Sequence, residues 1–414
     1  MKTMLVSMGA ALVAAVAAQA ASTVSDVTVS FGVESREVRV GYTLTGDPAI
    51  VTVAFRKDGE RIGGERYWNV AGDVNIVVKP GAGRSISWRP ELLWPDQKLD
   101  AACVTAEVTA WSLDAPPQYA VVWLKEKRAV KYYASEDTLP YGGRTNALYM
   151  TTLLAMSRIP AKGVTWLMGS PETEPGHNRG LDETQHYVTF TNDYYVGVFP
   201  VTQGQLTAVG IGNKSGYSYP APAVKFTYNQ IRGTPGADED IDWPRTGSAV
   251  ATTSVLGKFR ARTGLAFDIP TEAQWEFAAR AGSPTAFPNN LTIASDANDV
   301  RDENLSKIGF YKKDDGGRHG VGGRAKNAWG LYDVCGTIWE YCRDWVSTTD
   351  PIGTAEVVDP PGLQSGTVRS RRGGCYDNQP WAARCAFRTS NSPTDENMLI
   401  SFRFCLPLSE VVGK

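Results

Sequence analysis

Between Ser22 and about Leu124, short stretches of alternating apolar and polar residues follow one another, separated by turns rich in Gly, Pro and Asp. This alternation is typical of strands that bury one face. About seven such strands in roughly 100 residues match the size of an immunoglobulin-like or fibronectin-like sandwich. The pattern therefore predicts an all-β sandwich over residues 22–124. The clearest strands cover residues 27–31, 38–42, 51–55 and 104–111.

The pattern changes after a Lys-rich connection, which we expect to be a linker over residues 125–146. Thr202 and Thr271 each precede a Gln by three residues, a spacing in which hydroxyl and amide satisfy each other's backbone donors at the start of a helix. Because regular elements are few and glycines are many, an α+β, loop-rich domain is predicted over residues 147–408. Its expected helices cover 203–209, 255–263 and 272–281, and its expected strands 148–156, 329–332 and 402–406.

The first twenty residues have the pattern of a cleaved signal peptide. Lys2 gives a basic start, residues 4–17 are apolar, and residues 18–20 have the small-x-small form that signal peptidase recognises. The apolar run is shorter than the ~18 residues that a spanning helix needs, and no later segment is long and apolar enough to span a membrane. We therefore predict an exported protein, secreted, periplasmic or on the cell surface, in an oxidising compartment where cysteines can pair.

Composition narrows the classes of function. The 42 basic and 44 acidic side chains give a net charge of −2 without a long run of one sign, so nucleic acid is not indicated as a partner. Three His are too few for a multi-histidine metal centre. The 41 Gly and 24 Pro indicate many turns, in agreement with a loop-rich second domain.

Six sequence blocks stand in order in this second domain. They include TEAQWEF at residues 271–277, NAWGLYD at 327–333 and Arg-Gly-Gly at 372–374. Together they resemble the formylglycine-generating enzyme family, also called sulfatase-modifying factors, over roughly residues 147–406. The resemblance implies a variant of the C-type lectin fold. The complete blocks cover residues 166–172, 199–203, 269–282, 327–342, 372–374 and 402–405.

The resemblance also implies an activity, the oxidation of a sulfatase cysteine to formylglycine with dioxygen and copper. This chemistry needs two thiolates around Cu(I), because soft sulfur ligands select that ion. In the family the two cysteines follow the Arg-Gly-Gly run, five residues apart. Here Asn378 occupies the first position, and the second falls near Ala382 in a shorter loop. Cys375, which replaces the family's usual Ser, and Cys385 remain as candidate catalytic thiols at a different spacing.

The missing thiol pair leads to two hypotheses. The first is a non-catalytic binding paralogue, in which the surface of Asn378, Gln379 and Trp381 binds a protein, peptide or glycan, such as a sulfatase or another exported protein. The alternative is a divergent copper-dependent formylglycine-generating oxidoreductase that acts on sulfatases and uses Cys375.

Calcium sites are also implied by the family. One would use the carboxylates of Asp333 and Glu340 with the backbone carbonyls of Gly336 and Ile338, all hard oxygen ligands. The alternative interpretation of the same residues, without a metal ion, is that Asp333 caps a turn and Glu340 is solvated. A second site would use Asn304 and the carbonyl of Leu305.

Disulfides are expected for an exported chain with six cysteines. Cys385 and Cys405 match family positions that form disulfides, but the family's partner positions hold Ala279 and, roughly, Arg262. The pairs must therefore differ here. The expected pairs are Cys342 with Cys385 and Cys335 with Cys405, which leaves Cys375 free or paired outside.

Overall fold

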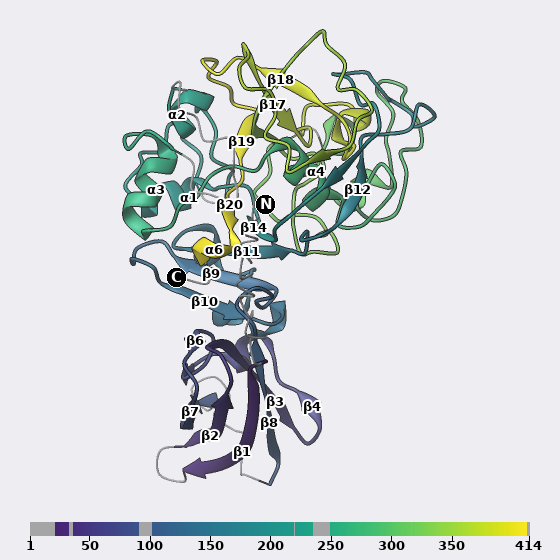
Figure 1. Cartoon of the computed structure of the whole chain (residues 1–414). Coiled ribbons are helices and arrows are strands. Elements are labelled where there is room, and N and C mark those ends of the chain that lie inside the picture. The colour runs from purple at the N-terminus through teal and green to yellow at the C-terminus, as the bar shows by residue number, and fades with distance from the viewer. Residues whose placement is uncertain are drawn as a thin grey trace, which may run out of the picture.

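The computed structural model describes residues 21–32, 36–90, 102–218, 220–234, 249–315 and 317–411, and the predicted signal peptide lies outside these ranges. The chain forms a β-rich N-terminal part and a larger, loop-rich part, arranged end to end (Figure 1). Within the described ranges, no helix is long and apolar enough to cross a membrane.

Two sheets of the N-terminal part pack over one apolar core. At its centre the rings of Phe55 and Trp88 stack with centroids 4.5 Å apart. One sheet has the order β1-β2-β7-β5; in the other, β3 pairs with β4, β6 and β8. These strands are β1 (Thr23–Gly32), β2 (Glu37–Thr45), β3 (Ala49–Lys57), β4 (Glu60–Arg61), β5 (Val70–Gly72), β6 (Val77–Val78), β7 (Gly81–Trp88) and β8 (Val104–Trp111). The expected strands are therefore present, while the immunoglobulin or fibronectin class stays a prediction.

The border between the two parts lies before residue 119, not after 124. Strand β9 (Tyr119–Trp123), which we expected in the sandwich, pairs with β11 (Leu153–Ile159) of the second domain. Strand β10 (Val130–Tyr133), inside the expected linker, pairs with the other edge of β9. Tyr119 to Val122 are at most 7% exposed, so burial of these apolar side chains accounts for their place in the larger sheet.

In the described part of the second domain, the strands form three sheets. The largest has the order β10-β9-β11-β14-β20, a second has β12-β13-β16, and a third has β18-β17-β15-β19. The parallel pairing of β15 with β19 joins segments about sixty residues apart. The remaining strands are β12 (Thr165–Met168), β13 (His186–Thr189), β14 (Tyr194–Gly197), β15 (Trp339–Val346), β16 (Val357–Val358), β17 (Val368–Arg372), β18 (Thr389–Asn391), β19 (Ile400–Phe402) and β20 (Cys405–Pro407).

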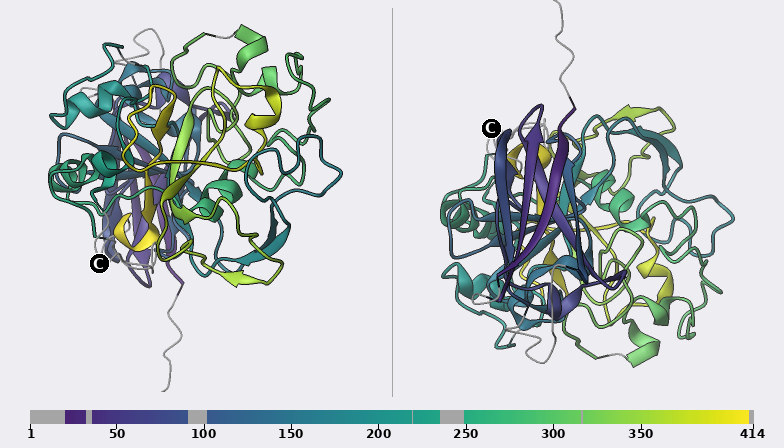
Figure 2. Two further views of the ribbon diagram at one scale, coloured as in Figure 1. Left: turned by 90° about the horizontal axis from the view of Figure 1, so that it is seen from above. Right: turned by 90° about the horizontal axis from the view of Figure 1, so that it is seen from below.

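The predicted helices are confirmed, and their capping residues explain why they begin where they do. Thr202 and Thr271 both form the reciprocal hydrogen bonds of a capping box with a Gln three residues later. Viewed along the long axis, the teal helices α1 to α3 lie on one side of the domain (Figure 2). The helices are α1 (Gln203–Ala208), α2 (Tyr228–Arg232), α3 (Val255–Thr263), α4 (Glu272–Arg280), α5 (Lys312–Asp315) and α6 (Leu408–Val411).

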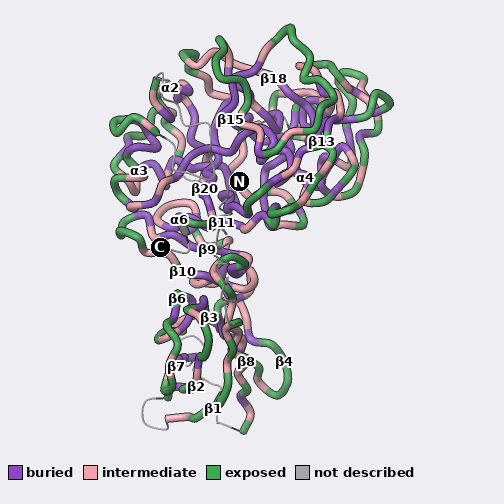
Figure 3. The backbone as a smooth tube through the Cα atoms, in the orientation of Figure 1, coloured by how far each residue is buried: buried purple, intermediate pink, exposed green. Residues whose placement is uncertain are grey.

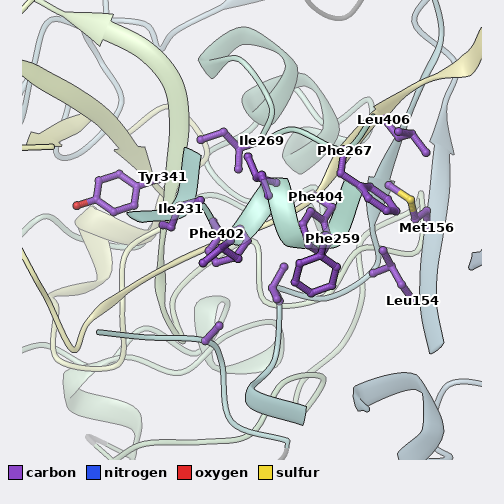
Figure 4. Close-up of a cluster of buried hydrophobic side chains, with 14 of the residues drawn as sticks. Leu154, Met156, Ile231, Phe259, Phe267, Ile269, Tyr341, Phe402, Phe404 and Leu406 are labelled. Carbon is purple, nitrogen blue, oxygen red and sulfur yellow. The ribbon is translucent and has the colours of Figure 1, made fainter. Parts of the chain in front are cut away.

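The core of the second domain lies between these helices and the large sheet. Phe259 of α3 meets Phe404 edge to face at 4.7 Å, and Phe404 also contacts Phe402 and Phe267 (Figure 4). Buried backbone runs through the centre, whereas exposed segments lie mostly at the periphery (Figure 3). This loop-rich arrangement is consistent with the C-type-lectin-like domain that the resemblance implies.

All three strands expected in the second domain differ from the structure. The stretch expected at 402–406 is divided between the end of β19 and the start of β20, with residues 403–404 in neither strand. Residues 329–332 form a turn, because Asn327 Oδ1 accepts hydrogen bonds from the backbone N–H groups of Trp329 and Leu331 at 3.0 and 2.9 Å. The apolar stretch expected at 148–156 begins with a 3₁₀ turn, η5 (Ala147–Met150), before β11 starts. Apolar character alone does not separate a strand from a buried turn.

Candidate functional site

The Arg-Gly-Gly run turns the chain sharply at the end of β17. Gly373 and Gly374 have φ angles of +92° and +75°, the left-handed region that favours glycine. A Cβ on Gly374 would lie 2.8 Å from the carbonyl oxygen of Ala382, so the two arms of the following loop approach closely only because no side chain stands there. We call residues 373–384 the RGG loop; it includes the 3₁₀ turn η7 (Pro380–Ala383).

Buried arginines hold both ends of the RGG loop. Arg372, at the end of β17, is fully buried, hydrogen-bonds to Glu276 of α4 and donates to the carbonyl oxygens of Ala386 and Phe387 at 2.7 Å. Glu272 on the same helix faces Arg388 and Arg372. Although burial raises the pKa of Glu272, these two guanidinium groups hold it down at about 2.

Arg384 fixes the other end of the loop. Its guanidinium is fully buried and binds both carboxylate oxygens of Glu183 at 2.8 Å and one of Glu174 at 2.6 Å. Its Nε donates to the carbonyl oxygen of Trp381 at 3.1 Å. Sequence reasoning missed these pairs, because the acids lie about two hundred residues before the arginine and no local spacing connects them.

Cys375 and Asn378 face each other inside the RGG loop. Asn378 Oδ1 accepts hydrogen bonds from the backbone N–H of Cys375 at 3.0 Å and from its Sγ at 2.9 Å. The thiol is fully buried, and burial raises the pKa of Cys375 to about 11. At neutral pH this group is a protonated thiol, so it is a weak nucleophile and a weak metal ligand.

Gln379 and Trp381 connect the RGG loop to a neighbouring loop. Gln379 Oε1 accepts from the backbone N–H of Asp299 at 2.7 Å, and Trp381 Nε1 donates to Asn298 Oδ1 at 3.2 Å. The Trp381 ring is half-buried, with Phe387 at a centroid distance of 5.4 Å and the guanidinium of Arg179 at 5.3 Å. These contacts are all within the protein, and they hold the two loops against each other.

A cavity of about 230 Å³ lies beside the RGG loop. Arg318 Nε donates to the hydroxyl of Tyr376 at 2.7 Å, and the same guanidinium lies 4.7 Å from the ring centroid of Tyr217. His319 stacks on Phe310 with centroids 3.6 Å apart. Asn378, Gln379 and Trp381 do not line this cavity, so Tyr376 is the RGG-loop residue that reaches it. The cavity is lined by Tyr217, Pro220, Arg318, His319, Thr337 and Tyr376, among others.

A larger cavity of about 490 Å³ lies elsewhere, bounded by residues 344–347 and parts of 350–363. Asp344, one of the buried acids that line it, accepts the backbone N–H of Glu272 at 2.8 Å and thereby caps α4. Burial, with a contribution from Glu272, raises the pKa of Asp344 to about 7. This carboxyl already has a structural partner, so the smaller cavity beside the RGG loop is the better candidate site.

Residues 152–406, more than half of the chain, match the family described as the sulfatase-modifying factor enzyme 1-like domain. The chain belongs to this family. It is 36% identical over 154 residues to the formylglycine-generating enzyme of Thermomonospora curvata, and 32% identical over 155 residues to that of Streptomyces coelicolor. Each alignment covers 33% of this chain, and 48% and 45% of the relatives. The chain thus matches about half the length of these relatives.

The chain is also similar to proteins with other names. A serine/threonine-protein kinase pkn1 of Chlamydia pneumoniae is 32% identical over 137 residues, which are 33% of this chain and 20% of that protein. Among solved structures, PvdO from Pseudomonas aeruginosa aligns with a TM-score of 0.46 and 23% identity, over 61% of this chain and 94% of PvdO. Treponema denticola variable protein 1 aligns with a TM-score of 0.45 and 21% identity, over 62% and 96% of the two chains.

The copper chemistry of the sulfatase-modifying factor family needs two neighbouring thiolates, and this requirement can be tested on the RGG loop. The partner of the Cys375 thiol is the amide of Asn378, and the groups with the largest effects on its pKa include Asp377 and Arg371 but no second thiol. Cys385, the other candidate, belongs to a different apolar cluster. The residues present therefore do not fit a two-thiolate copper site, and we derive no reaction step through copper.

The first calcium site implied by the family also fits poorly. Glu340 is fully buried, neither solvated nor free to bind a cation, because its two carboxylate oxygens accept from Arg403 at 2.6 and 3.0 Å, with a further bond from Trp275 Nε1 at 2.8 Å. Asp333 accepts from the backbone N–H of Gly322 at 2.7 Å and from the hydroxyl of Thr337 at 3.2 Å. Asp333 therefore stabilises a turn, as the interpretation without a metal ion expected.

Two of the three backbone carbonyls expected as calcium ligands accept hydrogen bonds within the protein. The carbonyl of Gly336 accepts from the N–H of Ile338 at 2.8 Å, and the carbonyl of Leu305 accepts from two N–H groups at 2.9 Å. The side-chain amide of Asn304 donates to the carbonyl of Thr292 at 3.0 Å. Within the described ranges, no group of three or more His, Cys, Asp or Glu side chains gathers as a metal site would. Most of the expected calcium ligands are therefore engaged in hydrogen bonds within the protein.

Cys335, Cys342, Cys375, Cys385 and Cys405 are free thiols in the structure. Neither expected disulfide is present. Cys405 Sγ lies 3.9 Å from the side-chain oxygen of Gln274, and Cys342 lies among the charged groups of Glu272 and Asp344. Cys335 is fully buried in the same apolar cluster as Cys342, Cys385 and Cys405.

Proposed function

We propose that this chain is an exported, non-catalytic binding member of the sulfatase-modifying factor family, which binds a polypeptide segment of a partner protein in the cavity beside the RGG loop. Export rests on the basic, apolar and small-residue pattern of residues 1–20. The partner would be a sulfatase or another exported protein, because relatives that share this domain are named formylglycine-generating enzymes.

One observation carries the non-catalytic part of the proposal. The position that aligns with the first family cysteine is Asn378, and its side chain is bonded to the buried thiol of Cys375 at 2.9 Å. An amide cannot replace a thiolate as a Cu(I) ligand, since Cu(I) is selected by soft sulfur donors. The RGG loop keeps its shape through this internal hydrogen bond, whereas the oxidase chemistry needs two sulfurs facing one metal.

The cavity supports a polypeptide ligand. Its volume of about 230 Å³ is below the ~300–1,000 Å³ of typical small-molecule sites, so it suits one or two side chains of a longer segment. Prolines and aromatic rings supply apolar walls, and exposed Arg318 supplies N–H donors at the rim. The Arg318 guanidinium lies 4.7 Å from the ring centroid of Tyr217 and 5.9 Å from that of Tyr376. A guanidinium positioned in this way can donate hydrogen bonds to a peptide carbonyl or carboxylate.

The test uses the purified full chain, loaded with Cu(I), and a fluorescently labelled peptide with the sulfatase pattern Cys-x-Pro-x-Arg. Mass spectrometry in air with a thiol reductant should show an unchanged cysteine, beside a formylglycine-generating enzyme that converts the same peptide. Conversion to the aldehyde by this chain would overturn the non-catalytic assignment and support the oxidase alternative.

Binding is measured separately, by anisotropy of labelled peptides cut from sulfatases and other exported proteins. Arg318→Ala should weaken the binding of any captured peptide at least about tenfold, the equivalent of one lost charge-assisted hydrogen bond. Arg301→Ala is the matched control, because Arg301 is also exposed, pairs with Glu303 at 3.1 Å and does not line the cavity. Equal affinities of the two variants would show that peptides bind elsewhere.

A further inference from the structure

A cavity of about 420 Å³ lies where the N-terminal part meets the second domain. One wall comes from the N-terminal part, chiefly residues 67–71, and the other from β9, β10 and the short turns that follow them. Strands β9 and β10 lie at the end of the second domain that faces the N-terminal part (Figure 1). The volume of this junction cavity is within the ~300–1,000 Å³ of typical small-molecule sites.

The wall from the N-terminal part carries a half-buried aromatic ring. It follows the 3₁₀ turn η1 (Gly64–Tyr67), which is fixed to the sandwich because the hydroxyl of Tyr67 donates to the carbonyl of Val53 at 2.6 Å. Trp68, the next residue, lines the cavity. Its ring meets that of Tyr141 from the second domain edge to face, with centroids 5.1 Å apart. Aromatic rings from both parts of the chain therefore form one apolar surface.

The other wall places a second aromatic ring beside a positive charge. Lys131 of β10 is directly opposite Val121 of β9, and Trp123 is two residues further along β9, so the three side chains lie on one face of the sheet. Lys131 Nζ lies 5.7 Å from the ring centroid of Trp123. The lysine is exposed, the ring is half-buried, and both line the cavity.

Hydrogen bonds across the junction hold the two walls in place. The guanidinium of Arg61, in β4, donates to Asp137 Oδ2 and to Ser135 Oγ, both at 2.8 Å. The backbone N–H of Tyr132, in β10, donates to the carbonyl of Asn75 at 2.9 Å. Because the walls are fixed before a ligand arrives, binding needs little reorganisation.

The polar lining of the junction cavity indicates which groups a ligand brings. Arg89 and Lys131 are exposed cations, and none of the described residues that line the cavity is acidic. Arg89 lies 3.6 Å from Glu37, whereas Lys131 contacts a neutral ring. Asn75 is 3% exposed, and its side-chain oxygen has no hydrogen-bond partner within the described residues. A negative group for Lys131 and a hydroxyl donor for Asn75 would satisfy both.

We propose that the junction cavity binds an anionic saccharide, a short chain of sugar rings with carboxylate or sulfate groups. A sugar ring presents a C–H face, which packs on the negative face of an aromatic ring, and hydroxyl donors at its edge. Trp68 and Tyr141 meet at 61°, so these two rings form no parallel slot for a flat base. No residue of the RGG loop lines this cavity, and the inference does not depend on the proposed peptide binding.

The first test is isothermal titration calorimetry of the full chain at low salt. The probes are a heparin-derived tetrasaccharide with sulfates, a tetragalacturonate with carboxylates, and neutral cellotetraose. At least one anionic probe should bind at least about tenfold more tightly than the neutral one, the equivalent of one charge-assisted hydrogen bond. Which of the two binds distinguishes sulfate from carboxylate. The proposal is overturned if neither binds with a Kd below about 1 mM, if cellotetraose binds as tightly, or if ATP binds more tightly than either.

The second test places the saccharide in the junction cavity. Lys131→Met keeps the apolar stem and should reduce the affinity for the anionic probe to about that of the neutral one. Lys127→Met is the matched control, because Lys127 is exposed in the turn of the same hairpin and does not line the cavity. Trp68→Ala should weaken binding about tenfold, whereas Tyr187→Ala, which removes a ring that is 54% exposed on β13, should not. Equal affinities of the two lysine variants would show that the saccharide binds elsewhere.

Discussion

The salt bridge of Arg384 allows a quantitative test of how the RGG loop is held. We consider the substitution Arg384→Met, which keeps much of the side-chain volume and removes the charge. In the native protein this guanidinium is the buried partner of Glu183 and Glu174, at 2.6 to 2.8 Å. Glu183 is itself fully buried, and its remaining side-chain partner is the hydroxyl of Ser170 at 2.7 Å. The variant therefore leaves a carboxylate in a desolvated place without its counter-charge.

The expected loss is about 3–5 kcal/mol of unfolding free energy, the usual result of removing one member of a buried ion pair. Typical domains are stable by about 5–15 kcal/mol, so the loss is a large fraction of the total. Adding Glu183→Gln to the Arg384→Met variant should restore part of it, because a neutral amide costs less to bury than a carboxylate.

The assay is urea unfolding followed by tryptophan fluorescence and far-ultraviolet circular dichroism. Arg179→Met is the matched control in the same region. Arg179 pairs with Asp296 at 3.1 Å, but the two side chains are 37% and 48% exposed. Its contact with the ring of Trp381 adds little at such a site. The control should therefore lose at most about 1–2 kcal/mol.

Two results would refute this reasoning. A loss in Arg384→Met no larger than that of Arg179→Met would mean that the buried carboxylates find water or other partners at little cost. A double variant less stable than Arg384→Met would mean that the charge of Glu183 is not the source of the loss.

Two further predictions concern the loop and its surroundings. Asn378→Cys places a second sulfur beside Cys375 and should tighten Cu(I) binding at least about tenfold, measured in competition with a chromophoric chelator. Asn378→Ser, which adds no sulfur, serves as the control. Equal Cu(I) affinities of the two variants would show that residue 378 does not face the Cys375 thiol. Burial raises the pKa of Asp333 from 3.8 to about 6, so ionisation of this carboxyl costs stability as pH rises from about 4 through 6. The unfolding free energy of the Asp333→Asn variant, relative to that of the native chain, should therefore rise by about 2 kcal/mol between pH 4.5 and 7.5. If the difference between the urea midpoints of the two chains stays constant over this range, Asp333 does not titrate as described.

The N-terminal prediction was accurate where local alternation decided the structure. The stretch expected at 104–111 is β8, with the same bounds. Strands β9 and β10 were assigned to the sandwich and the linker, because a short apolar run does not reveal its partner. Strand β9 pairs with β11, which begins about thirty residues after β9 ends, and β10 pairs with the other edge of β9.

In the candidate site too, the sequence predicted some features, and tertiary contacts decided the others. The order of the blocks led to the family and to the RGG loop, and the absence of the second thiol is visible in the sequence itself. The contacts of Asn378, Gln379 and Trp381 are not. These side chains were expected to face a ligand, but they bond to Cys375, Asp299 and Asn298, respectively. Side-chain direction within an irregular loop depends on neighbours that the sequence does not identify.

Sequence by itself predicted α1, α3 and α4, and the starts of α1 and α4 depend on hydrogen bonds between residues three apart. Thr271 with Gln274 needs no tertiary partner to be recognised. Tertiary structure alone decided which charged side chains meet. Glu340 binds Arg403 instead of a cation, and Arg384 binds Glu174 and Glu183, which lie about two hundred residues before it. The physical reason is that such pairs gain their energy from joint burial, and burial is a property of the packed chain rather than of any local segment.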